Sequence, residues 1–86
     1  MAVTLLYLAW VREHIGIAQE DLDALPPGVT TAADLAGWLT TRGAGYAAAF
    51  ADLTRLRCAV DQTMTALDAP LGNAREIAFF PPVTGG

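Results

Sequence analysis

The end of the chain constrains its fold more than any other stretch. Residues 76–80 read Glu-Ile-Ala-Phe-Phe and place successive apolar side chains on opposite faces, as a β-strand does. Pro81 and Pro82 follow directly. Because proline has no N–H to donate to a neighbouring strand, these two residues end the strand. We therefore expect a strand that stops abruptly and a C-terminal tail that projects from the body.

The residues of this tail are suited to reach into another protein. Pro81 and Pro82 favour an extended backbone, and six extended residues span about 20 Å. Gly85 and Gly86 have no Cβ atoms, so they fit a channel little wider than a peptide. We expect a flexible tail over residues 81–86 whose reactive group is the α-carboxylate of Gly86.

Size and composition exclude several classes of protein. With 86 residues, the chain has room for one small core but not for a substrate pocket together with a cofactor site. Its hydrophobic fraction of 53% is high for such a small domain, which suggests that some apolar surface meets a partner. A net charge of −4 without a basic cluster argues against nucleic acid or an anionic membrane as partner. No apolar run approaches the roughly 18 residues of a membrane-spanning helix, and no signal peptide is evident, so we expect a cytoplasmic protein.

The pattern of the remaining chain predicts one α+β domain over residues 1–80. Its first strand is almost wholly apolar, which favours a central position covered on both faces or nearly so. Its second strand carries acidic residues, as an edge strand does. Thr31 is suited to cap the main helix, with Asp34 in the first turn. Strands are expected at 3–10, 20–25, 55–60, 63–66 and 76–80, a helix after Thr31, and a second short helix or extended connection at 46–53.

The side chains that could carry chemistry within the domain are better explained by structure. Cys58 is the only cysteine and alternates inward on its strand, so we assign it to the core rather than to persulfide chemistry. His14 is the only histidine and fits an exposed turn. Glu20, Asp21 and Asp23 are crowded enough to suggest a metal site, but a solvated edge is the simpler interpretation. We expect no metal site.

Residues 79–86, Phe-Phe-Pro-Pro-Val-Thr-Gly-Gly, resemble the C-terminal signature of the small, sulfur-carrying subunit of molybdopterin synthase, a ubiquitin-like β-grasp family. The resemblance extends to residues 7–16, 60–63 and 68–71. It implies a β-grasp: a mixed sheet with one main helix packed on one face, and the first and last strands side by side at its centre. In one departure, Asp61 stands where the family commonly has Asn; both residues tolerate left-handed turns.

The resemblance also implies a chemistry for the tail. A carboxylate is a poor electrophile, so a ubiquitin-activating-type adenylyltransferase would use ATP to join AMP to Gly86, and a sulfur donor would then replace the AMP. The large subunit of molybdopterin synthase would receive the resulting thiocarboxylate and pass its sulfur to a cyclic pterin precursor. This chain would be the non-catalytic subunit, without a bound cofactor, in a heterotetramer of two small and two large subunits. The expected partner-binding residues are Phe80, Pro81, Pro82, Val83, Thr84 and Gly85.

Three alternatives remain open at this point. The same tail would serve a sulfur carrier for thiazole or another product. It would also serve a ubiquitin-like modifier that is attached to lysines of target proteins, although this chain has no lysine and cannot accept its own tail. Finally, the tail could be an inert terminus on a plain interaction module.

Overall fold

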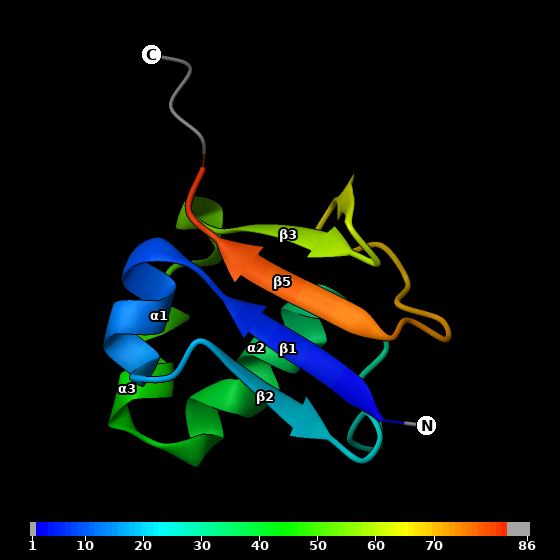
Figure 1. The fold of residues 1–86 in the computed structure, drawn as a ribbon, viewed down its shortest axis with the longest axis horizontal. Coiled ribbons are helices and arrows are strands. Elements are labelled where there is room, and N and C mark those ends of the chain that lie inside the picture. The colour runs from blue at the N-terminus through cyan, green and yellow to red at the C-terminus, as the bar shows by residue number, and fades with distance from the viewer. Residues whose placement is uncertain (1, 83–86) are drawn as a thin grey trace.

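The computed structural model describes residues 2–82, and its centre is a five-stranded sheet with strand order β2-β1-β5-β3-β4 (Figure 1). β1 and β5 are parallel neighbours, and every other pair is antiparallel. The predicted α+β class is confirmed, with the first and last strands side by side at the centre. The strands are β1 Val3–Tyr7, β2 Gln19–Leu22, β3 Arg57–Val60, β4 Thr63–Thr65 and β5 Glu76–Phe80.

The main helix, α2 (Ala32–Leu39), lies across one face of the sheet (Figure 1). It begins as predicted: the Thr31 side chain accepts a hydrogen bond from the Asp34 N–H at 3.0 Å, and the Asp34 carboxylate accepts one from the Thr31 N–H at 3.2 Å. Hydrogen bonds from Thr30, and then from Thr31, lower the pKa of Asp34. The other helices are α1 (Ala9–Ile15), α3 (Ala44–Ala49) and two 3₁₀ turns at Thr40–Arg42 and Leu53–Arg55.

The core lies between α2 and the inner face of the three middle strands. Alternation places every second side chain of β1 and β5 on this face, where it is fully buried. Cys58 is also buried there, as predicted; its thiol donates to the Thr65 carbonyl oxygen at 3.1 Å, and burial raises its pKa. The buried residues of this core include Val3, Leu5, Tyr7, Leu35, Ala36, Leu39, Cys58, Ile77 and Phe79.

The first strand differs from its prediction in length and in coverage. β1 ends at Tyr7, and Ala9 turns the chain with a φ of +53° into α1, so Trp10 belongs to a helix. Coverage of the second face is only partial: Leu6 is half-buried, and Leu8, which directly follows the strand, is 48% exposed. A strand with two covered faces and a strand with one bare apolar face have the same sequence pattern, so periodicity could not distinguish them.

The predicted solvated position of Glu20 is also wrong. Its side chain on β2 is only 15% exposed, and its carboxylate accepts hydrogen bonds from the hydroxyls of Tyr7 and Tyr46 at 2.8 and 2.6 Å. Arg42 completes the cluster with an ion pair to Glu20 at 2.9 Å, and its guanidinium lies over the rings of Trp38 and Tyr46. This cluster ties the sheet edge to α3. Asp21 and Asp23 are exposed, as expected.

We expect the Glu20 cluster to make stability depend on pH. Burial alone would raise the pKa of Glu20, but the hydrogen bonds from Tyr46 and Tyr7 and the charge of Arg42 together lower it below its ordinary value of 4.5. The ionised form therefore stabilises the fold above that value, and this stabilisation is lost as the pH falls through the lowered pKa. Glu20→Gln should reduce the free energy of unfolding by about 1–3 kcal/mol at pH 7 and by less at pH 3.

Urea denaturation of the wild type and the variant at both pH values checks this expectation. Glu13→Gln, at an exposed position of α1, is the matched control and should change little. An equal loss for Glu20→Gln at pH 7 and pH 3 would contradict the role of the charge.

The packing of α1 against α3 generates a second prediction, at Gly45. A Cβ atom on this residue would overlap the carbonyl oxygen of His14, whereas a Cβ on Gly37 in α2 would meet open space. Gly45→Ala should therefore destabilise the domain by about 1–3 kcal/mol through overpacking. Gly37→Ala should stabilise it by about 0.5–1 kcal/mol because alanine is the better helix former. Urea denaturation of the two variants measures both changes, and stabilisation by Gly45→Ala would show that the helices can separate freely.

Candidate functional site

The root of the tail is fixed by the position of β5 at the centre of the sheet. β5 pairs with β1 through Tyr7 and Phe79, and with β3 through Arg57 and Phe80. A strand held by hydrogen bonds on both sides has a fixed direction. Figure 1 shows that β5 ends beside the start of β3 and the beginning of α1, at one end of the sheet. The tail therefore departs from a rigid platform.

The beginning of β5 is anchored by the turn between β3 and β4. Asp61 and Gln62 have φ values of +50° and +69°, so Asp retains the left-handed turn expected of this position. The Asp61 carboxylate accepts hydrogen bonds from the N–H groups of Arg75 and Glu76 at 2.9 and 3.0 Å. The Asp61 N–H donates to the Glu76 carbonyl oxygen at 2.9 Å. Sequence analysis predicted the turn but missed this second role, because nothing local links Asp61 to the last strand.

The tail residues predicted to bind a partner fall into two groups. Phe80, Pro81 and Pro82 are described, and each is half-buried. The structure brings these three together at the end of β5, while their contact with a partner stays a prediction. Val83, Thr84, Gly85 and the predicted reactive Gly86 lie outside the described residues, as does most of the predicted 81–86 tail.

Two further exposed apolar residues lie on the same side of the sheet as Phe80, and the sequence pattern did not single them out. Leu8 directly follows β1 and donates its N–H to the Phe79 carbonyl oxygen at 3.2 Å, and its side chain is 48% exposed. Met64 on β4 is 61% exposed and pairs with Ala59 of β3. Ala59 and Ala78 lie between them on the face of the sheet that α2 does not cover. Phe80 shares this face, so the tail root borders a bare apolar surface, which we call the outer face.

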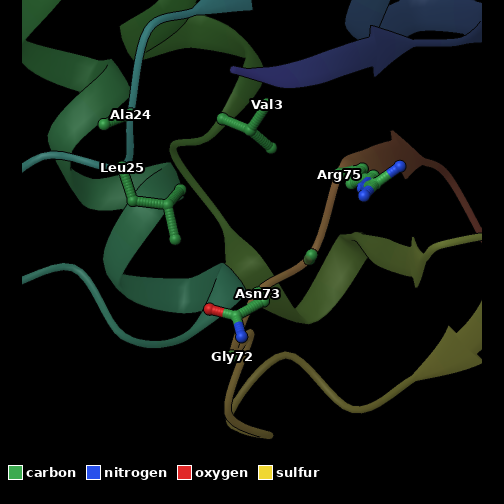
Figure 2. A pocket seen from close by; sticks show the side chains of 7 residues that line it. Val3, Ala24, Leu25, Gly72, Asn73 and Arg75 are labelled. Carbon is green, nitrogen blue, oxygen red and sulfur yellow. The ribbon is translucent and has the colours of Figure 1, made fainter. Parts of the chain in front are cut away.

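A pocket of about 250 Å³ opens at the other end of the sheet. It lies where β1 and β5 begin, away from the strand end that leads into the tail. Figure 2 shows Val3 and Leu25 as its apolar side and Asn73 and Arg75 as its polar side chains. This pocket contains no predicted site residue and no paired acid and base.

The described residues offer no metal site. Within residues 2–82, no group of three His, Cys, Asp or Glu side chains lies close enough to hold a metal ion. His14 is exposed on α1, where its ring meets the Trp10 ring edge-on at 6.0 Å. None of the helices that the structure describes is long and apolar enough to cross a membrane.

The fold defines a ubiquitin-like β-grasp protein. It has a mixed sheet of five strands, a helix across one face and a central last strand that two prolines follow. The sequence profile of the ThiS family matches residues 5–86, and the chain belongs to that family.

Relatives and solved structures agree with this assignment. The chain is 37% identical over 84 residues to the molybdopterin synthase sulfur carrier subunits of Escherichia coli and Haemophilus influenzae, covering 98% of this chain and 99% of each relative. SAMP1 from Haloferax volcanii has a similar fold, with a TM-score of 0.67 at 21% identity over the whole of both chains. A putative molybdopterin converting factor subunit 1 from Pyrococcus furiosus gives a TM-score of 0.64 at 20% identity, covering 96% of this chain and 99% of that one. These structures support the predicted β-grasp.

The contrast between Phe79 and Phe80 yields a prediction. Phe79 has no exposed surface and packs its ring against Phe50 with centroids 5.0 Å apart, so it belongs to the core. Phe80 is only half-buried, on the outer face. Phe79→Ala should reduce the free energy of unfolding by about 3–5 kcal/mol, because it leaves a cavity. Phe80→Ala should reduce the free energy of unfolding by less than half that amount. Urea denaturation measures both, and equal losses would show that Phe80 serves the core instead of presenting a surface.

Proposed function

We propose that this chain is a cytoplasmic sulfur carrier in molybdenum cofactor biosynthesis and acts as the small subunit of a molybdopterin synthase. The observation that carries the proposal is the 37% identity, over 98% of the chain, to two sulfur carrier subunits of molybdopterin synthase. The terminal Phe-Phe-Pro-Pro-Val-Thr-Gly-Gly sequence supports it, because this stretch supplies the tail that the chemistry needs.

The proposed reaction consumes the C-terminus as a reagent. In the active site of a ubiquitin-activating-type adenylyltransferase, the Gly86 carboxylate attacks the α-phosphorus of ATP. This step forms the acyl adenylate and releases pyrophosphate. A sulfur donor then displaces AMP, and the C–O bond to AMP is replaced by a C–S bond. The thiocarboxylate finally gives its sulfur to a cyclic pterin precursor in the active site of the large subunit. Catalytic groups are expected on the partners, in a complex of two small and two large subunits.

The described residues suit the delivery of a tail. β5 is held between two strands, so the tail starts from a fixed point and direction. Pro81 and Pro82 restrict the backbone there, which reduces the entropy lost when a partner takes the tail. The outer face places Leu8, Met64 and Phe80 where a protein that takes the tail would cover them. With Val83, Thr84 and Gly85, the three tail residues Phe80, Pro81 and Pro82 form the proposed contact set.

Two other uses of the same tail make different predictions. A carrier for thiazole or another sulfur product would form the same thiocarboxylate but would not support pterin conversion by the large subunit. A ubiquitin-like modifier would form isopeptide conjugates with lysines of other proteins, and these would be visible in a cell lysate.

Intact-mass spectrometry tests the first chemical step. The protein is incubated with its adenylating enzyme, ATP and a sulfide source. We expect a mass gain equal to the replacement of one oxygen by sulfur, and fragmentation should place it on Gly86. Adding the large subunit and the pterin precursor should return the mass to that of the carboxylate as product forms.

Two variants provide the controls. Deletion of Gly86, and addition of one residue after it, should both abolish the mass gain and product formation. Neither should change the melting temperature, because a chain terminus contributes little to stability. Normal product formation by either variant would refute the proposal.

A further inference from the structure

The end of the sheet at which β5 stops carries positive charge. Arg57, the first residue of β3, lies directly opposite Phe80 in the strand register. Arg55 ends the 3₁₀ turn just before it. Both side chains are exposed. Two of the five arginines of the chain therefore flank the strand end that leads into the tail.

Both guanidinium groups are held in place by their own domain. Nη1 of Arg57 donates hydrogen bonds to the carbonyl oxygens of Leu56 and Thr54 at 2.8 and 3.4 Å. The guanidinium of Arg55 lies over the Trp10 ring, 5.5 Å from its centroid, and lines an open groove of about 340 Å³. Because the two cations are already oriented, a partner loses little side-chain entropy by binding them.

Among the described residues, no carboxylate forms an ion pair with either cation. The ion pair within residues 2–82 is that of Arg42 with Glu20, so neither Arg55 nor Arg57 has a described carboxylate within ion-pair distance. Asp52 comes nearest in sequence, and the charge of Arg55 contributes to lowering its pKa. The larger causes are the hydrogen bonds that its Oδ1 atom accepts from the Thr54 hydroxyl and N–H, and Asp52 lines the same groove as Arg55 without forming an ion pair with it.

Three acidic residues lie at the opposite end of the sheet. Glu76 opens β5 beside Thr4, and Asp21 of β2 is the partner of Thr4 on the other side. The Asp61 carboxylate lies at the same end, bonded to the Glu76 N–H. This acidic end is about 13 Å from Phe80, the length of four strand residues. These three acidic residues therefore lie away from the tail root, and the exposed arginines there would attract an acidic partner.

We propose that Arg55 and Arg57 form a cationic collar around the tail root and pair with carboxylates of the large subunit of molybdopterin synthase at the mouth of the channel that receives the tail. The proposal rests on the proposed function. A partner that takes six tail residues to their end must bring its surface against the end of β5, where Arg57 lies opposite Phe80. The protein that holds the tail would therefore also contact Arg55 and Arg57.

Charge reversal with a matched control tests the collar. Arg57→Glu and Arg55→Glu place the new charge at the tail root, whereas Arg75→Glu makes the same change in net charge at the far end. Association of each full-length variant with the large subunit is followed by stopped-flow fluorescence. Arg57→Glu should lower the association rate constant about tenfold at low salt, and the effect should shrink at roughly 0.5 M salt. Arg75→Glu should change it less than about twofold.

The outcomes separate the collar from the proposed function. Arg57→Gln keeps a neutral polar side chain and should show an intermediate loss, and the melting temperatures confirm that each variant is folded. Equal rates for Arg57→Glu and Arg75→Glu overturn the collar while leaving the carrier function intact. If Arg57→Glu lowers the rate of adenylation by the adenylating enzyme alone to a similar extent, the assignment of the collar to the large subunit is overturned. Failure of the wild type to bind the large subunit overturns both proposals.

Discussion

The pairing of β5 with β1 on one side and β3 on the other is the interaction on which the rest of the structure depends. It joins the last strand to the first in parallel and places both at the centre of the sheet. The parallel pair requires a crossover between the two ends of the chain, and α2 lies within that crossover on the inner face. The strand that carries the tail is therefore also the strand that organises the core, so the tail root cannot move without disturbing the fold.

The inner and outer faces of this sheet serve different purposes. The inner face, with Phe79 and its buried neighbours, supplies the apolar burial that a domain of 86 residues needs. The outer face leaves Leu8 and Met64 exposed and Phe80 half-buried. Such apolar exposure costs solubility unless a partner covers it, which agrees with the carrier function that we propose. Function and stability thus use opposite faces of the same sheet.

Several contacts that fix the domain join residues far apart in sequence. Glu20 accepts hydrogen bonds from Tyr7 and Tyr46 at the sheet edge, and the Asp61 carboxylate accepts them from two N–H groups at the start of β5. The sequence pattern indicated an acidic edge and a turn, and both exist. It did not indicate that Glu20 is half-buried, because a carboxylate on an edge strand is solvated unless the fold brings donors to it. The donors come from β1 and α3, whose relative position is a tertiary property.

The sequence by itself determined the class of fold, the succession of strands along the chain, the cap at Thr31, the core position of Cys58 and the abrupt end of β5 at Pro81. These features follow from periodicity, capping and the missing N–H of proline, which act over a few residues. Only the tertiary structure decided that β1 stops at Tyr7, that one face of the sheet stays bare and that Arg55 and Arg57 flank the tail root. Those features depend on which strands pair and where the helices pack, and the physical reason is that burial is set by neighbours distant in the chain.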